Sequence, residues 1–352
     1  MNWPGVIQAY RSFLPVPANA EVITLLEGNT PLIPTPRFVD QIGGKFQLFV
    51  KLEALNPTAS FKDRGMTMAV TMAKARSAEV LVCASTGNTS ASAAAYAARA
   101  GMKAAVILPH GKIAMGKLAQ ALIYGARIVP ISGNFDQALD LVRALGERPN
   151  VAVVNSINPV RIEGQKTAAF EISDNLGRAP DFHFIPVGNA GNITAYWKGF
   201  REYHAGGRIK SLPKMMGWQA AGSAPIVDGH IIENPHTVAT AIRIGNPASW
   251  KGAVAAAKDS GGKIDKVSDE EILDAYQLIS RSEGIFVEPA CAAPLAGLIR
   301  CVREGLIPKD SIVTVTLTGH GLKDPDTAIS VCKQELIPVE PRVEAVLEAI
   351  QG

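Results

Sequence analysis

Short apolar runs alternate with longer amphipathic segments along the chain from Lys45 onward. Apolar runs of this kind predict buried β-strands, and apolar residues spaced three and four apart predict helices. The first unit has a strand at residues 46–53 and a helix at 61–76, and the second has a strand at 79–84 and an alanine-rich helix at 88–100. Strands that alternate with helices are typical of β-α units with a parallel sheet.

The same alternation continues to residue 317. Further strands are expected at residues 103–108, 126–131, 151–155, 182–187, 215–220 and 312–317. Further helices are expected at residues 112–124, 135–145, 161–176, 192–204, 269–283 and 291–304. Residues 223–263 are richer in Gly, Pro, Asn and His and have weaker periodicity, so we expect a long excursion near the active site.

The composition indicates a globular protein of more than one domain. The chain has 352 residues, which exceeds what one hydrophobic core usually supports and predicts about two domains. The 35 Lys and Arg residues are scattered among 32 Asp and Glu residues, which leaves a net charge of +3. This pattern makes nucleic acid a poor partner and fits a small anionic substrate held by a few local cations.

The sequence carries no signal for a metal site, a membrane span or export. The cysteines Cys83, Cys291, Cys301 and Cys332 lack C-x-x-C spacing and a histidine neighbour, so we expect buried thiols and no metal. No apolar run reaches the roughly 20 residues that span a bilayer. Residues 1–4 lack the features of a signal peptide. We therefore expect a cytoplasmic protein with no membrane association.

One loop places a lysine at a helix start. Residues 56–65 read Asn-Pro-Thr-Ala-Ser-Phe-Lys-Asp-Arg-Gly and lead into a predicted helix. The helix dipole disfavours the ammonium group of Lys62 there, so we expect a lowered pKa for Lys62. Such an amine is suited to forming an imine with a carbonyl compound. Taken alone, a surface lysine beside Asp63 and Arg64 is the more common interpretation.

Other loops between strands and helices offer groups that bind anions. Residues 84–90, Ala-Ser-Thr-Gly-Asn-Thr-Ser, present hydroxyls and the backbone N–H groups of a helix start. Residues 187–192, Val-Gly-Asn-Ala-Gly-Asn, contain glycines that let backbone amides approach a phosphate, although the spacing matches neither the P-loop nor the dinucleotide fingerprint. Residues 314–321 place the hydroxyl of Thr318 and two glycines at the carboxyl end of a predicted strand. Each loop alone also fits an ordinary turn.

Together these segments resemble the fold-type II pyridoxal-phosphate enzymes, which include tryptophan synthase β, cysteine synthase, serine/threonine dehydratase and threonine synthase. The resemblance covers most of the chain. Its ordered motifs are Leu-Glu-Gly-Asn-Thr-Pro-Leu at 26–32, Ser-Phe-Lys-Asp-Arg-Gly at 60–65, Ser-Thr-Gly-Asn at 85–88, Gly-Asn-Ala-Gly-Asn at 188–192, Glu-Pro-Ala at 288–290, and Thr318. They are most similar to the shorter class of threonine synthases. Ala59 stands where that class usually has glycine, and Cys291 where serine is common.

The resemblance implies an α/β fold of two lobes, each a mostly parallel twisted sheet flanked by helices, with the active site between them. Residues 54–157 would form the smaller lobe, and residues 1–53 with 158–352 the larger lobe, which binds pyridoxal phosphate. Lys62 would hold this cofactor as a Schiff base and move protons at Cα and Cβ of the substrate. The other implied cofactor contacts are Asn88 at the ring hydroxyl oxygen, Thr318 at the pyridine nitrogen, and Gly188, Asn189, Ala190, Gly191 and Asn192 at the phosphate.

As a threonine synthase, the enzyme would convert O-phospho-L-homoserine and water to L-threonine and phosphate by γ-elimination and β-hydration. The substrate contacts expected are Ser85, Thr86 and Thr89 at the α-carboxylate, and Asn155, Ser156 and Arg161 at the phosphate. A guanidinium suits this role because its planar fork matches phosphate oxygens, although Arg161 also fits a helix surface. Glu288 is expected to line the active site. The family further implies a homodimer.

Two other interpretations remain open on the sequence alone. A serine/threonine dehydratase, or another fold-type II lyase, would share the fold, the lysine and the phosphate loop, but it needs no site for a second phosphate. Arg161 is the residue that separates these enzymes from a threonine synthase. A catalytically silent protein that keeps the fold as a binding module is the second possibility, and Lys62 argues against it.

Overall fold

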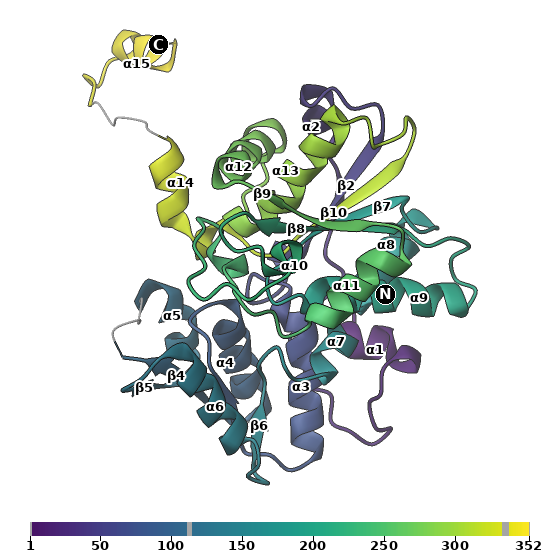
Figure 1. Ribbon diagram of the computed structural model, residues 1–352. Helices are drawn as coiled ribbons and strands as arrows, with labels where there is room; N and C mark the ends of the chain where they lie inside the picture. The colour runs from purple at the N-terminus through teal and green to yellow at the C-terminus, as the bar shows by residue number, and fades with distance from the viewer. Residues whose placement is uncertain (1, 111–114, 333–337, 352) are drawn as a thin grey trace.

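The computed structural model describes residues 2–110, 115–332 and 338–351, and within them the chain folds around two β-sheets (Figure 1). The larger sheet has the strand order β1-β2-β10-β7-β8-β9. Its strands are β1 (Leu32–Pro34), β2 (Gln47–Leu52), β10 (Ile312–Leu317), β7 (Phe182–Pro186), β8 (Lys214–Ala220) and β9 (Lys263–Val267). β1 pairs antiparallel with β2, and the other neighbouring pairs are parallel.

Helices cover both faces of the larger sheet. One face packs against α2 (Pro36–Gln41), α12 (Asp269–Glu283) and α13 (Pro289–Arg303). The other face packs against α8 (Thr167–Leu176), α9 (Gly191–Ala205) and α11 (Trp250–Asp259). Strands buried on both faces read as continuous apolar runs, which is why β7 and β8 are evident in the sequence.

The smaller sheet is entirely parallel. Its strands in spatial order are β5 (Arg127–Ile131), β4 (Lys103–Pro109), β3 (Val80–Cys83) and β6 (Val151–Val153). Helices α3 (Lys62–Ala75), α4 (Asn88–Ala100) and α5 (Met115–Ile123) share one core with this sheet, and α6 (Phe135–Leu145) packs on the other face. The first residues of α3 and α4, Lys62 and Asn88, therefore belong to the helices of one lobe.

The remaining elements are short or lie toward the chain ends. They are α1 (Val6–Ala9), α7 (Val160–Gln165), α10 (Pro225–Asp228), α14 (Pro325–Cys332), α15 (Val343–Gln351) and the 3-10 turns η1 (Arg11–Phe13), η2 (Glu53–Leu55), η3 (Thr240–Ile242) and η4 (Gly321–Lys323). Figure 1 shows α14 and α15 extending away from the two sheets. None of the helices in the described part of the chain has the length and apolarity needed to cross a membrane.

The predicted α/β architecture with mostly parallel sheets is confirmed, and some details differ. The helix expected at 161–176 is two helices, α7 and α8, joined at Lys166. Lys166 keeps right-handed helical backbone angles (φ −58°, ψ −25°), so the hydrophobic period passes through the junction and gives no sign of it. Residues 112–114 of another expected helix lie outside the described residues. The boundaries between the lobes at residues 53/54 and 157/158 stay a prediction.

The segment 223–263, expected to be an irregular excursion, contains α10 and α11 and leads into β9, which was not predicted. β9 lies at the edge of the larger sheet and carries charged side chains, among them Lys263 and Asp265. Charged edge strands are common because they discourage pairing with other chains, but their apolar signal is weak.

Helices α3 and α7 make close backbone contact. A Cβ atom added to Gly164 in α7 would lie 1.8 Å from the carbonyl oxygen of Arg64 in α3. Only glycine permits this approach, because any side chain would push the helices apart. The contact fixes the start of α3 relative to the start of α7.

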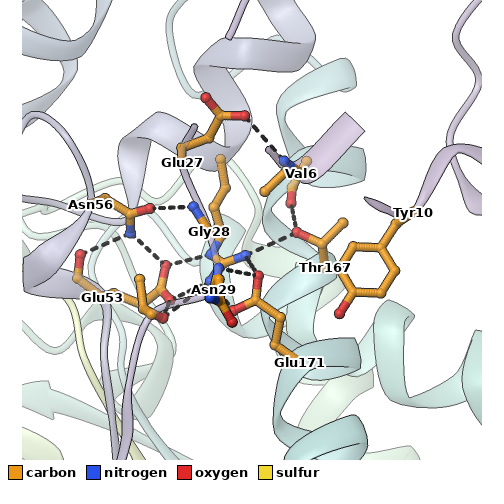
Figure 2. A network of polar contacts seen from close by, with 12 residues as sticks. Val6, Tyr10, Glu27, Gly28, Asn29, Glu53, Asn56, Thr167 and Glu171 are labelled. Atoms are coloured by element: carbon orange, nitrogen blue, oxygen red, sulfur yellow. Dashed lines mark hydrogen bonds and ion pairs between the residues drawn. The ribbon is translucent and has the colours of Figure 1, made fainter. Parts of the chain in front are cut away.

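A buried network of charges centred on Arg64 joins α3 to the larger sheet and to α8. Arg64, whose side chain is 1% exposed, donates to both carboxylate oxygens of Glu53 at 2.6 and 2.7 Å. It also donates to both oxygens of Glu171 at 2.6 and 2.7 Å. Lys51 Nζ donates to Glu171 Oε2 at 2.6 Å. Figure 2 shows Glu53 and Glu171 approaching this centre from separate segments, with Asn56 and Thr167 at its edge.

The network balances its own charge. Burial alone would raise the pKa of Glu171, but Arg64 and Lys51 outweigh burial and lower it to about 2. Two cations therefore face two carboxylates, and each carboxylate depends on its partners because a lone buried charge is costly.

Replacing Arg64 should destabilise the protein strongly. Arg64→Ala leaves Glu53 and Glu171 with Lys51 as their remaining cation, and the loss of one partner from a buried ion pair typically costs about 3 to 5 kcal/mol. Urea unfolding of the cofactor-free protein would measure the change in the free energy of unfolding. The control is Arg143→Ala, since Arg143 is 54% exposed and pairs with Asp140; a change under about 1 kcal/mol is expected there. Equal small losses in both variants would contradict the prediction.

Candidate active site

The loop before Lys62 pairs with the loop after β10. Phe61 N donates to Thr318 O at 2.9 Å, and His320 N donates to Ala59 O at 3.1 Å. Ser60 and Gly319 form an isolated antiparallel bridge between them. These contacts hold Lys62, the first residue of α3, beside the carboxyl end of β10. Ligands of open α/β sheets bind at such strand ends.

Lys62 has the electrostatics of a reactive amine. Burial of its ammonium group lowers the pKa of Lys62 to about 7, and the nearby Arg161 guanidinium acts in the same direction. The carboxylate of Glu288 opposes this shift. The Nζ atom lies 4.3 Å from the centre of the Phe61 ring, an apolar neighbour that cannot accept a strong hydrogen bond. A substantial fraction of Lys62 is therefore neutral and nucleophilic near pH 7.

Asn88 and the hydroxyls around it lie where β3 passes into α4. Asn88 Nδ2 donates to Glu288 Oε1 at 2.6 Å, which ties the smaller lobe to the start of α13. Ser85 Oγ accepts from Gly87 N at 3.2 Å, and no side chain caps α4. Among the described residues no side chain occupies the first N–H groups of α4, which leaves them open to an anion; the contacts predicted for Ser85, Thr86 and Thr89 stay a prediction.

The predicted phosphate loop follows β7 and opens α9. Ala190 adopts a left-handed conformation (φ +64°) as the N-cap of α9. Gly188 has no room for a side chain, because an added Cβ would lie 2.9 Å from Ile242 Cα. Asn189 Oδ1 accepts from Ala248 N at 2.8 Å, so residues of the 223–263 segment brace this loop. Both amide atoms of Asn192 are buried without a hydrogen-bond partner among the described residues.

Thr318 lies against a cysteine at the end of β10. The Cys291 sulfur accepts from Thr318 N at 3.1 Å and from Gly319 N at 3.3 Å, and it lies 3.4 Å from Thr318 Oγ1. Thr318 is 6% exposed, so its hydroxyl has little access to solvent. The sequence analysis expected Cys291 to be a buried thiol that departs from the family, and its role in holding this loop is seen only in the fold.

The predicted second anion site contains a buried guanidinium. Arg161 is 1% exposed and donates Nη1 to Val154 O at 3.0 Å, while its Nε and Nη2 have no partner among the described residues. Burial lowers the pKa of Arg161 to about 10, so the side chain is still a cation at neutral pH. Asn155, which was expected to contact the substrate phosphate, binds the backbone in the structure. Its carboxamide binds both backbone groups of Ala84, at 3.0 Å each, and so clamps the end of β3.

The structure thus brings Lys62 close to Arg161, Glu288 and Thr318. Asn88 joins them through Glu288, and Arg161 connects to the phosphate loop through its neighbour Ile162, whose Cδ1 lies 3.9 Å from a Cβ built on Gly191. Ser156 has a partly exposed side chain in this region. Sequence reasoning missed the Asn88 contact to Glu288, because the two residues lie 200 positions apart.

These groups fit pyridoxal phosphate. The cofactor needs an amine for its aldehyde, N–H groups for its phosphate and a polar partner for its ring nitrogen. The neutral fraction of Lys62, the start of α9 with the unpartnered Asn192 amide, and the Thr318 hydroxyl supply these groups. Within the described residues, no cluster of three or more His, Cys, Asp or Glu side chains is placed to hold a metal ion.

One family model and several known proteins are similar to this chain. The family model described as "pyridoxal-phosphate dependent enzyme" matches residues 23–319. A threonine synthase of Mycobacterium leprae is 58% identical to this chain over 349 residues, which cover 99% of this chain and 96% of the relative. A threonine synthase of Halalkalibacterium halodurans is 56% identical over 356 residues, which cover 100% of this chain and 98% of the relative.

Among solved structures, the processed form of threonine deaminase isoform 2 from Solanum lycopersicum is similar, with a TM-score of 0.74 at 20% identity over 87% of this chain and 83% of that chain. Maize serine racemase has a TM-score of 0.71 at 20% identity, over 87% of this chain and 92% of that chain. At these identities the likeness shows a shared fold.

The lowered pKa of Lys62 predicts an unusual pH dependence. Neutral amine forms as the pH rises through about 7, whereas free lysine side chains titrate near pH 10.4. Trace acetylation of the cofactor-free protein, followed by mass spectrometry of the Lys62 peptide, should therefore give a reaction rate that rises through about pH 7 and then levels off. A blocked lysine derivative in the same reaction is the reference. A Lys62 rate that parallels this derivative up to pH 10 would contradict the assignment.

Ala59 predicts a stabilising substitution. Its φ of +64° lies in the left-handed region, where a Cβ costs roughly 1 to 2 kcal/mol. Ala59→Gly removes that cost and adds a smaller entropic cost in the unfolded chain, so the free energy of unfolding should rise by about 1 kcal/mol. Ala98→Gly, at an exposed position inside α4, is the matched control and should lower stability by about 1 kcal/mol. Changes of the same sign in both variants would disprove the strain at Ala59.

Proposed function

The chain belongs to the family of pyridoxal-phosphate dependent enzymes, and we propose that it acts within this family as a threonine synthase. It is a lyase of the fold-type II architecture with pyridoxal phosphate as its cofactor. It converts O-phospho-L-homoserine and water to L-threonine and phosphate, the last step of threonine biosynthesis. The structural observation that carries this proposal is the buried guanidinium of Arg161, which lies beside Lys62 with its Nε and Nη2 atoms unpartnered among the described residues.

The proposed cofactor contacts follow the polar groups described above. Lys62 would attach the cofactor covalently, and Asn88 would donate to the ring hydroxyl oxygen. The Thr318 hydroxyl would meet the ring nitrogen as a neutral partner, which would favour a less protonated nitrogen than a carboxylate would. The phosphate is held at the start of α9 by Gly188, Asn189, Ala190, Gly191 and Asn192. The free amide of Asn192 supports this assignment, because a buried amide normally has a partner.

The substrate contacts extend from the same loops. Ser85, Thr86 and Thr89 hold the α-carboxylate at the start of α4, where unpaired N–H groups favour an anion. Arg161 holds the departing phosphate, together with Ser156. Asn155 contributes through the clamp on Ala84, and its side chain has one Nδ2 hydrogen left for a phosphate oxygen.

Lys62 performs the proton transfers. Pyridoxal phosphate, when bound, supplies the electron sink that stabilises negative charge at the substrate Cα. The Lys62 amine would remove protons from Cα and Cβ of the substrate, and the phosphate would leave Cγ with the electrons of the C–O bond. Lys62 would return protons to Cγ and Cα, water would add its hydroxyl at Cβ, and the remaining proton of the water would go to the released phosphate. A pKa near 7 suits this role because both protonation states are populated at neutral pH.

We also propose that the protein is a cytoplasmic homodimer. Helix α15 carries an exposed apolar stripe of Val343, Val346, Leu347 and Ile350, which are 69%, 42%, 49% and 74% exposed. Their spacing places them on one helix face, which a second copy of the chain would cover. The cysteines are all unpaired, as expected in a reducing compartment. A single monomeric species in sedimentation at micromolar concentration would rule out the dimer.

The function is tested by product stoichiometry. The cofactor-loaded protein is supplied with O-phospho-L-homoserine, and threonine and phosphate are measured in the same samples. Equal amounts are expected because one elimination feeds one hydration, and Lys62→Ala should form neither product. Phosphate release without threonine, or no phosphate release, would move the assignment to a dehydratase or another fold-type II lyase.

Arg161 separates the threonine synthase from a dehydratase. Arg161→Ala removes a charge-assisted contact to phosphate, which is typically worth about 1.5 to 3 kcal/mol, so kcat/KM for O-phospho-L-homoserine should fall by roughly one to two orders of magnitude. Any deamination of L-threonine should change little, because that substrate has no phosphate. Arg201→Ala, at an exposed position in α9, is the control and should leave both rates unchanged. An equal loss for both substrates would remove Arg161 from the phosphate site.

A further inference from the structure

Glu288 is a buried carboxylate at the candidate active site, and its side chain does not cap its own helix, α13. It occupies the N-cap position of α13 and makes no side-chain capping hydrogen bond. N-cap side chains usually accept from the first N–H groups of the helix. The Glu288 side chain is 6% exposed, and its Oε1 instead accepts from Asn88 Nδ2 at 2.6 Å. The carboxylate is therefore directed at a residue of the other sheet's helices.

The carboxylate is held in place from a second side. Glu288 N donates to Gly319 O at 3.0 Å, which fixes the backbone beside the Thr318 loop. A Cβ added to Gly319 would lie 1.6 Å from Glu288 Oε1. The side chain therefore lies directly on the Gly319 Cα, and a larger residue at position 319 would displace it.

The contact determines which end of the Asn88 amide faces Glu288. An ionised carboxylate only accepts hydrogen bonds, so Nδ2 rather than Oδ1 of Asn88 must point toward it. Burial raises the pKa of Glu288, while the hydrogen bond from Asn88 and the cations Lys323 and Lys62 act in the opposite direction. The Asn88 N–H and the Lys323 ammonium group favour the charged form of the carboxylate, whereas burial and the nearby Asp324 act against it.

We propose that Glu288 is a positioning residue that sets the orientation of the Asn88 amide and thereby presents its second Nδ2 hydrogen to the ring hydroxyl oxygen of pyridoxal phosphate. This inference rests on the proposed placement of Asn88 at the cofactor. An amide turned by 180° would present Oδ1, which repels an acceptor oxygen. Glu288 acts through Asn88, and the lost contact should appear in cofactor affinity before any substrate is added.

A double-mutant cycle tests the proposal. The dissociation constant of pyridoxal phosphate and the absorption spectrum of the bound cofactor are measured for the full-length wild type, Glu288→Ala, Asn88→Ala and the double variant. One hydrogen bond to the ring oxygen corresponds to about a 3- to 10-fold change in affinity, so each single variant should weaken binding by that factor. The double variant should be no weaker than Asn88→Ala, because both changes remove the same contact.

Two further variants separate the contact from charge and from folding. Glu288→Gln keeps an acceptor oxygen for Asn88 and should bind the cofactor within about 2-fold of wild type. Gly319→Ala leaves Glu288 in the chain but pushes its carboxylate away, so it should weaken binding as Glu288→Ala does, and it gives the test a second route if Glu288→Ala fails to fold. The control is Glu283→Ala. It removes a different carboxylate, which accepts from Phe38 N at 2.7 Å, and it should not change cofactor affinity.

Additive losses in the double variant would overturn the proposal, since Glu288 would then act independently of Asn88. An equal loss for Glu288→Gln and Glu288→Ala would also overturn it, because charge rather than hydrogen bonding would be responsible. These measurements need no substrate. A failure to form threonine would therefore leave the result standing, and a failed cycle would leave the proposed reaction standing.

Discussion

The position of the reactive lysine depends on the buried ion network at Arg64. This residue lies two positions after Lys62 and is bound on both sides by Glu53 and Glu171. Because Lys51 completes the set, the two carboxylates are neutralised by the two cations within the network. The network therefore fixes the first turn of α3 without offering Lys62 a counter-ion, and the low pKa of Lys62 survives beside several buried carboxylates.

The site combines rigid backbone with a few uncommitted polar atoms. Asn155 clamps Ala84, Cys291 receives the N–H groups after β10, and residues 248–249 brace Asn189. Against this background, the buried atoms without a partner among the described residues include the amide of Asn192 in the phosphate loop and two nitrogens of Arg161. Buried polar groups normally have partners, so these atoms indicate where ligand oxygens belong. In the proposed reaction, the Asn192 amide would contact the cofactor phosphate and the Arg161 nitrogens the substrate phosphate.

The sequence predicted the helices and strands that have a regular local pattern of apolar residues, together with the motifs at their ends. α4, α6, α12 and β10 have the expected bounds, since strong periodicity defines all four and capping boxes also begin α6 and α12. The break at Lys166 and the edge strand β9 were missed, because helical angles continue through the first and charged residues dilute the second. Lys62 and Thr318 could be chosen from their loops. The contacts of Glu288 and Cys291 could not, because each depends on tertiary packing between distant segments.

The backbone contact between Gly164 and Arg64 has an evolutionary consequence. Lys62 and Arg161 each lie in the first turn of a helix that makes this contact, so main-chain atoms rather than side chains set the distance between them. A lineage can therefore exchange the residue at position 161, the proposed partner of the substrate phosphate, without moving the backbone that carries Lys62. Within one scaffold, specificity can diverge while the core chemistry is inherited unchanged.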